Sequence, residues 1–285
     1  MDSLRAAKML LDRQPLSEYL PYLAYDEQSR AYILDNAVGL IFECHPLPYP
    51  SSSAASTLRG LFETQFPAGT SLQIMLYTSR KIGAQLDAYV MYRENTHGNS
   101  MYSDFARQRA EYLQSGADVS LFKGCDIRVR DFRMIVSMAV PCSHTPHAIN
   151  HVKDNVVPTM RDTVYQALNT AGLYPVSVGP EELINILSEI LNPGHSLRDN
   201  LYYDPKAAIK DQVIYSDTET EIRKDCLVLD GYHVKSYTVK QYPREWDVSG
   251  IMSYTGDVYQ NVKQIGAPFM LVLNCEYLDQ LSARR

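Results

Sequence analysis

Two apolar runs separated by an Asp-Asn pair place the strongest constraint on the fold. Residues 31–34 and 37–44 are largely apolar, and Asp35-Asn36 between them has the turn chemistry of a β-hairpin. Alternate residues of the second run, Val38, Leu40 and Phe42, would share one strand face. The following His-Pro-Leu-Pro sequence ends the strand, because proline cannot donate to a ladder. The pattern predicts a hairpin over residues 31–44 that starts a sheet.

The rest of the chain mixes further strands with amphipathic helices. The other expected elements are helices over 1–14, 51–66, 152–171, 180–191 and 250–265, an α-hairpin over 79–115, strands over 72–77, 127–140, 212–215 and 269–275, and a hairpin over 226–241. This order predicts an α+β fold with a mixed, mostly antiparallel sheet and helices packed on it. Residues 1–178 and 179–285 would form two α/β halves. Residues 278–285 have the pattern of the first turns of a longer helix, which predicts that the chain is truncated.

Composition limits the class of protein. The 285 residues suffice for one large or two modest domains, and 45% hydrophobic with 21% charged residues is typical of a soluble globular chain. The net charge of −6 argues against nucleic-acid binding, because a basic surface supplies most of that affinity. The five cysteines are scattered without a CxxC pair, which predicts reduced thiols in a cytosol. No signal peptide and no apolar run of about 20 residues is present, so membrane association would need a partner or a surface patch.

Tyrosine is unusually frequent, with 21 Tyr against 7 Phe and 1 Trp. A tyrosine buries its ring and keeps its hydroxyl wet, which suits half-buried surfaces and interfaces. Ordinary packing at sheet and helix edges accounts for such residues as well. Tyrosines beyond those that ordinary packing explains would indicate a docking surface.

Motifs for nucleotide chemistry are absent from the sequence. No glycine is followed by lysine, so the GxxxxGK[ST] phosphate loop is missing, as are GxGxxG, GxSxG and HExxH. Arg128, Arg130 and Arg133 offer a basic edge for phosphate or an acidic partner, although solvated edge charges that block sheet-to-sheet association are the favoured interpretation. We assign no catalytic and no cofactor-binding residue.

One short stretch holds potential metal ligands. Cys142, His144, His147 and His151 lie within ten residues, and the last two would share a helix face at i, i+4. Zinc is bound by such nitrogen and sulfur donors. The Cys-x-His spacing is tight, however, and no distant cysteine pair supports it. A polar loop with capping histidines is the simpler interpretation, and a stand-alone metal-dependent enzyme remains the alternative function.

Five separated stretches, in order along the chain, resemble the N-terminal region of the TraC-type ATPases of conjugative type IV secretion systems. The stretches are SEYLPYLAYDEQSRAYILDNAVGLIFECHPL from residue 17, FPAGTSLQIMLYTS from residue 66, IRVRDFRMIVSM from residue 127, LINILSEILNPGHSLRDNLYYDPKAAIKDQVI from residue 183 and CLVLDG from residue 226. They are apolar and turn patterns rather than a catalytic signature.

The resemblance implies a non-catalytic docking and assembly module. In that family the N-terminal region precedes a RecA-like motor, which would bind ATP and Mg²⁺ and which these residues lack. The family's ATPase docks at the cytoplasmic face of the bacterial inner membrane, oligomerises, and powers pilus assembly and DNA transfer. The implied partners are inner-membrane channel proteins and further copies of the chain, with no direct contact to nucleic acid.

Overall fold

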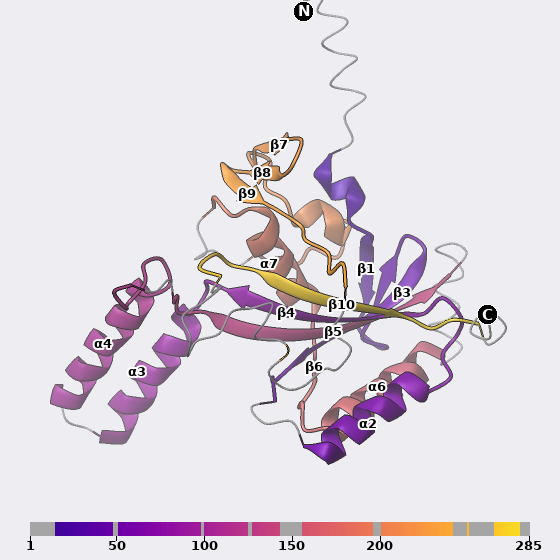
Figure 1. Cartoon of the computed structure of the whole chain (residues 1–285), viewed down its shortest axis with the longest axis horizontal. Helices are drawn as coiled ribbons and strands as arrows, with labels where there is room; N and C mark the ends of the chain where they lie inside the picture. The colour runs from indigo at the N-terminus through magenta and orange to yellow at the C-terminus, as the bar shows by residue number, and fades with distance from the viewer. Residues whose placement is uncertain are drawn as a thin grey trace, which may run out of the picture.

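The computed structural model describes residues 15–47, 51–97, 100–124, 127–142, 156–195, 201–241, 250 and 265–279 (Figure 1). The helices are α2 (Ser52–Glu63), α3 (Gly83–His97), α4 (Ser100–Ser115), α6 (Val156–Thr170) and α7 (Pro180–Leu191), with the 3-10 helices η1 (Leu16–Tyr19) and η2 (Ile209–Gln212). The strands are β1 (Tyr22–Asp26), β2 (Ala31–Leu34), β3 (Ala37–Cys44), β4 (Ser71–Ser79), β5 (Asp131–Pro141), β6 (Val176–Ser177), β7 (Thr220–Ile222), β8 (Leu227–Leu229), β9 (Tyr232–Val234) and β10 (Met270–Glu276). The helix predicted over 1–14 lies outside the described residues, as does nearly all of the one predicted over 250–265.

The main sheet has the order β1-β2-β3-β5-β4-β10, and β6 pairs with β3. Every pairing among the described strands is antiparallel. Strand β5 lies at the centre, paired with β3 along one edge and with β4 along the other. A small second sheet has the order β7-β8-β9. The α+β class with a mostly antiparallel sheet is confirmed. No helix in the described part of the chain combines the length and apolar character needed to cross a bilayer.

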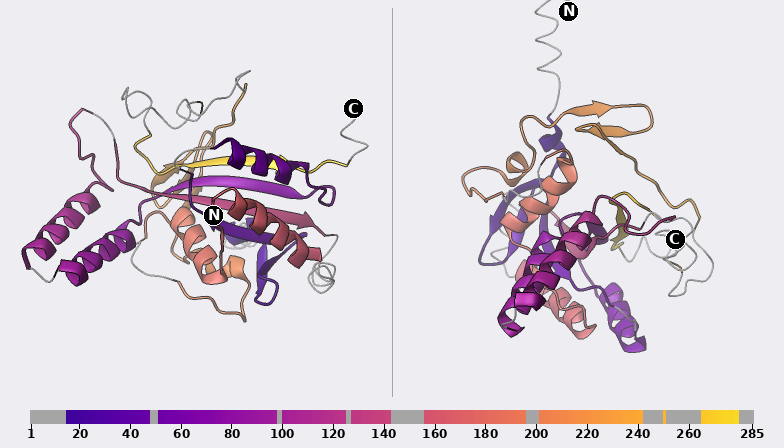
Figure 2. Two further views of the ribbon diagram at one scale, coloured as in Figure 1. Left: turned by 90° about the horizontal axis from the view of Figure 1, so that it is seen from below. Right: turned by 90° about the vertical axis from the view of Figure 1, so that its left-hand side faces the viewer.

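Helices cover both faces of the main sheet, so it has two hydrophobic cores (Figure 2). On one face, Leu40, Phe42 and Met138 pack with buried residues of α2 and α6. On the other, Ile41 and Ile135 pack against α7 and η2. The alternation of side chains along β3 and β5 therefore divides their residues between the two cores.

The hairpin predicted over residues 31–44 is present as β2 and β3. Its side chains occupy the predicted faces, since Val38, Leu40 and Phe42 share one core. Tyr32 on β2 is fully buried, and its hydroxyl donates to the carbonyl of Val178 at 2.8 Å. Burial raises the pKa of Tyr32, so its phenol remains a donor at neutral pH. That bond links the hairpin to the segment just before α7.

The strand predicted over 127–140 begins later, at Asp131. Residues 127–130 instead run beside the loop after α4, where the backbone N–H of Val129 donates to the carbonyl of Gly116 at 2.8 Å. The Arg130 guanidinium donates to the carbonyl of Ala117 on the same loop. These bonds hold residues 127–130 beside that loop rather than beside a neighbouring strand. The phase change near Asp131 thus marks a strand end rather than a bulge or a switch of sheet face.

Other predicted boundaries need smaller corrections. The strand predicted over 212–215 is wrong, because η2 ends at Gln212, whose side chain bonds the carbonyls of Asp204 and Ala207. The hairpin predicted over 226–241 pairs only residues 227–229 with 232–234. Asp230 and Gly231 between them both have positive φ, +47° and +80°, as a two-residue turn of this kind demands. The helix predicted to start near residue 152 is described from Val156, with Pro158 in its first turn, where proline is tolerated.

Strands from both predicted halves join one sheet. β10 pairs with β4 from Met270–Tyr77 to Glu276–Ser71, and β6 pairs with β3. Helix α7 completes the second core together with β2, β3 and β5. The division at residues 178 and 179 stays a prediction.

Gly116, just after α4, allows a close approach that a larger residue would block. A Cβ at this position would lie 2.6 Å from Cγ2 of Val129 and 2.8 Å from Cδ1 of Leu121. We expect Gly116→Ala to lower the free energy of unfolding by about 1–2 kcal/mol, since Val129 is β-branched and has little rotamer freedom. The control is Gly60→Ala in α2, where a Cβ meets nothing within 4 Å. It should raise stability by about 0.5–1 kcal/mol in urea unfolding; equal effects at both sites would contradict the packing argument.

Candidate functional site

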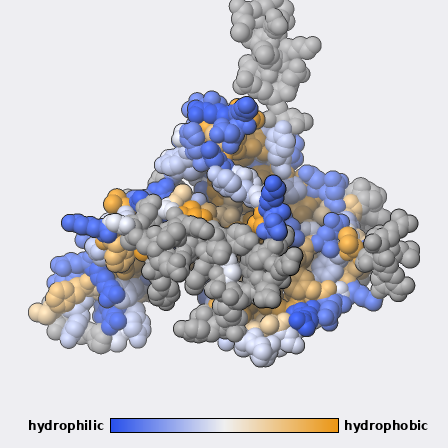
Figure 3. Space-filling view, in the orientation of Figure 1, coloured by the Kyte–Doolittle hydropathy of each residue, from blue (hydrophilic) through white to orange (hydrophobic). Residues whose placement is uncertain are grey.

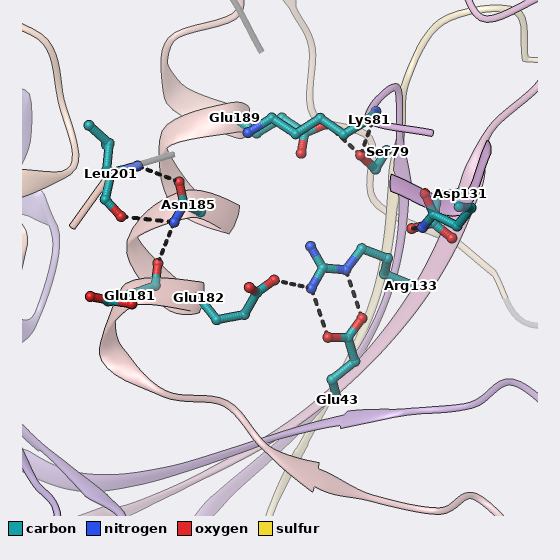
Figure 4. Close-up of polar contacts among 11 residues, drawn as sticks. Glu43, Ser79, Lys81, Asp131, Arg133, Glu181, Glu182, Asn185, Glu189 and Leu201 are labelled. Atoms are coloured by element: carbon teal, nitrogen blue, oxygen red, sulfur yellow. Dashed lines mark hydrogen bonds and ion pairs between the residues drawn. The ribbon is translucent and has the colours of Figure 1, made fainter. Parts of the chain in front are cut away.

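A polar cleft of about 580 Å³ lies where α7 faces the main sheet (Figure 4). Its lining comes from β5, α7 with the residue before it, the segment after residue 200, the β1–β2 turn and the residues just after β4. The lining residues are Glu27, Lys81, Arg133, Gly179, Pro180, Glu181, Glu182, Asn185, Glu189, Leu201, Tyr202 and Tyr203. Most charges here belong to glutamates, so the reactivity of the cleft depends on how these are paired.

Arg133 of β5 joins the sheet to α7 through two carboxylates. Its Nε and Nη2 atoms donate to the two oxygens of Glu43 on β3, each at 2.7 Å, and Nη2 also donates to Glu182. The Arg133 side chain is only 15% exposed. Burial alone would lower its pKa, but the hydrogen bonds to Glu43 and Glu182 outweigh burial and raise it. The guanidinium is therefore a fixed cation that holds the N-terminal turn of α7 on the sheet.

A second polar link connects β4 to the far end of α7. The Ser79 hydroxyl donates to Oε1 of Glu189 at 2.7 Å and accepts from the backbone N–H of Lys81 at 2.9 Å. Both Ser79 and Glu189 are buried. Burial and then the Glu189 charge raise the pKa of nearby Tyr77, which keeps that phenol protonated. Ser79 has a carboxylate partner but is closed to solvent, so this pair is suited to structure rather than to nucleophilic attack.

Asn185 fixes the rim of the cleft. Its amide nitrogen donates to the carbonyls of Glu181 and Leu201 at 2.8 and 3.0 Å, and its oxygen accepts from the Leu201 N–H at 2.9 Å. The two bonds to Leu201 tie an irregular segment to α7 as a strand pair would. Arg133, Glu182, Asn185 and Glu189 thus already have partners within the protein, and the described lining residues include no solvent-accessible pair of nucleophile and base.

Of the predicted metal ligands, the structure describes Cys142 alone. Its thiol is buried and lies 3.7 Å from the carbonyl oxygen of Val140. Burial raises the pKa of Cys142, which disfavours the thiolate that a metal needs. The three histidines, His144, His147 and His151, lie outside the described residues. In the ranges that are described, no three His, Cys, Asp or Glu side chains gather as a metal site would require.

The three arginines of the predicted basic edge do not form one surface. Arg133 is held by Glu43 and Glu182. Arg130 donates to carbonyls of residues 117 and 266, and Arg128 donates to the carbonyl of Asp118. These guanidinium groups contact the protein's own oxygens. The sequence pattern predicted a basic strand edge and gave no sign of these internal contacts.

A group of large exposed apolar side chains lies away from the cleft, on helices α3 and α4. Helices α3 and α4 form the predicted α-hairpin, which projects from one end of the sheet (Figures 1 and 2). Apolar side chains lie among charged ones on its surface (Figure 3). Those more than half exposed on the two helices are Met91, Tyr92, Met101, Tyr102, Phe105 and Tyr112. Tyrosines are exposed elsewhere too, so part of the tyrosine excess lies on surfaces.

Fold and surfaces together define a class: an α+β module whose antiparallel sheet carries a projecting helical hairpin and an internally paired polar cleft. The family model described as TraC protein matches residues 16–285. The chain belongs to this TraC family. It is 24% identical over 281 residues to Protein TraC of Escherichia coli (strain K12), an alignment that covers 93% of this chain and 31% of that protein. The chain therefore spans less than a third of the length of that relative.

Proposed function

We propose that this chain is the docking and assembly module of a conjugative type IV secretion ATPase. It binds channel proteins of the inner membrane and neighbouring subunits, and it sits at the cytoplasmic face of that membrane through those partners. ATP and Mg²⁺ are handled by a motor domain that these 285 residues do not contain.

The family match carries this proposal. It extends over nearly the whole chain, from residue 16 to residue 285, so it does not depend on one short motif. The sequence has no phosphate loop, which supports placing ATP hydrolysis outside these residues. In this proposal, a module that carries no catalytic site contributes to the secretion complex by binding other proteins.

The surfaces of the chain support a binding role. Exposed methionine and aromatic side chains are typical of protein interfaces, because methionine adapts its shape and tyrosine tolerates partial exposure. The projecting α3–α4 hairpin carries six of them. The hairpin projects away from the main sheet, so a partner can bind it without disturbing the two hydrophobic cores (Figure 1).

Interference with conjugation tests the proposal in cells. Donor cells that carry a complete TraC-type system would also express this chain in excess. We expect the transfer frequency to fall about tenfold, since copies without a motor occupy docking sites by mass action. The Asn192→Ala variant, which loses buried hydrogen bonds to Ser188 and Val213, should interfere less. An unchanged frequency at high levels of folded chain would count against the docking role.

A further inference from the structure

Helix α4 carries an exposed apolar stripe that packing within the hairpin does not explain. Met101, Phe105, Gln108 and Tyr112 recur at i, i+4, i+7 and i+11, so they lie in one row along the helix, and all four are exposed. The least exposed residues of α4 lie on another side, which faces α3. Those residues are Ser103, Ala106, Ala110 and Leu113. At 3.6 residues per turn, the two rows are centred about 150° apart.

The spacing of the stripe is that of a coiled-coil seam. Steps of four, three and four residues place Phe105 and Tyr112 at a positions and Met101 and Gln108 at d positions of a heptad. A soluble surface helix needs one apolar face, and α4 already uses one against α3. A second row with this spacing fits another helix with the same spacing.

The exposed area is of the size that a dimer interface requires. Met101, Phe105 and Tyr112 of the stripe, and Tyr102 beside it, are each 56–60% exposed. With about 200 Å² per side chain, they present about 450 Å² of mainly apolar surface. Interfaces are about 60% apolar, so the whole contact would bury about 750 Å² per partner, close to the standard of about 800 Å².

The charges beside the stripe select a partner and a direction. Asp104 and Arg109 occupy the g and e positions that flank the seam. Among the described residues, Arg107 pairs with Glu94, whereas Asp104 and Arg109 make no ion pair. In a parallel, in-register pair of α4 helices, Asp104 of each copy faces Arg109 of the other. An antiparallel pair would instead bring Arg109 against its own copy.

We propose that the α4 stripe binds the α4 stripe of a second copy of this chain, parallel and in register. Each copy contributes the same residues about a twofold axis, so Phe105 meets Phe105 and Tyr112 meets Tyr112. Gln108 meets its own copy at the centre, where two amides can donate to and accept from each other. Such a polar layer fixes register in coiled coils. The inference names the neighbouring-subunit contact of the proposed function, and it rests on that function only for its role in the cell.

Disulfide trapping tests the direction of the pair. In the parallel pair, Phe105→Cys and Tyr112→Cys each bring two identical cysteines within disulfide range, which needs Cα atoms about 4.4–6.8 Å apart. We expect each variant alone to give a disulfide-linked dimer as the main species under mild oxidation. In an antiparallel pair centred on Gln108, the two copies of position 105 would be about 9 Å out of register. Tyr237→Cys, at a tyrosine that is more exposed still, and the parent chain are the controls.

Charge exchange tests the proposed ion pairs. Asp104→Arg or Arg109→Asp should each weaken dimerisation about tenfold in sedimentation measurements, because each creates two like-charge contacts. The double variant Asp104→Arg/Arg109→Asp should restore it. Positions 104 and 109 are five residues apart and do not meet within one helix, so rescue must come from the partner. Phe105→Glu should weaken the dimer about a hundredfold, with Tyr237→Glu neutral.

The proposal would be overturned if the parent chain sediments as a monomer at 100 times the concentration used in the disulfide-trapping and charge-exchange experiments. A dimer that is unaffected by Phe105→Glu, or one trapped only when Phe105→Cys and Tyr112→Cys chains are mixed, would overturn it too. These measurements use the purified chain. Their results are therefore independent of the transfer assay, which needs the channel proteins of a donor cell.

Discussion

Replacing Arg133 with alanine should lower the free energy of unfolding by about 2–4 kcal/mol. The substitution leaves the Glu43 and Glu182 carboxylates close together without the cation that now joins them. Glu182 is about half exposed, so water compensates part of the loss and keeps the effect below that of a fully buried pair. Urea unfolding followed by circular dichroism measures the change.

Two further variants separate charge from geometry at this position. Arg133→Lys keeps the charge but cannot make the bidentate contact, so it should lose an intermediate amount of stability. Arg107→Ala removes an exposed ion pair with Glu94 and should cost no more than about 0.5 kcal/mol. Equal losses in Arg107→Ala and Arg133→Ala would show that the Arg133 bridge contributes nothing beyond a surface pair.

Asn192→Ala should destabilise the chain by a similar amount, about 2–4 kcal/mol. The Asn192 side chain is 1% exposed and sits at the end of α7. Its nitrogen donates to the carbonyls of Ser188 and Val213, and its oxygen accepts from the Tyr215 N–H and the Thr218 hydroxyl. Alanine leaves several of these buried groups without a partner, and each carries its own desolvation cost.

The matched control for this network lies on the same helix. Asn185→Ala also removes an amide that bridges two segments, but Asn185 is partly exposed, so water can replace its bonds to Leu201. It should cost about 1 kcal/mol. Hydrogen exchange should show faster opening of residues 213–218 in Asn192→Ala and of residue 201 in Asn185→Ala. The reverse pattern would contradict the assignment of these links.

Local patterns in the sequence were sufficient for much of the fold. The alternation of Val38, Leu40 and Phe42 indicated which strand face is buried, and Asp230-Gly231 indicated a tight turn, because both signals depend only on neighbouring residues. The start of β5 was misplaced because residues 127–130 have strand-like composition. Their hydrogen bonds instead go to residues 116 and 118, which are ten or more positions earlier in the chain. Tertiary contacts of this kind override local propensity.

The polar cleft could not be assembled from sequence. Glu43 and Arg133 are 90 residues apart, and Ser79 and Glu189 are 110 apart, so their pairing depends on the strand order. One signal was available: Glu43 shares the strand face of Ile41, an inward-facing position that requires a partner for a carboxylate. The partner's identity needed the structure. The metal-ligand candidates His144, His147 and His151 stay a prediction.

Capture of channel proteins from donor-cell membranes tests the central claim most directly. The tagged chain, expressed in donor cells of a TraC-type system, would be crosslinked, purified and analysed by mass spectrometry, with Asn192→Ala as the fold-loss control. The docking assignment predicts inner-membrane channel proteins of that system enriched at least about tenfold over the control. If the folded chain is recovered without any channel component, the chain does not dock as proposed.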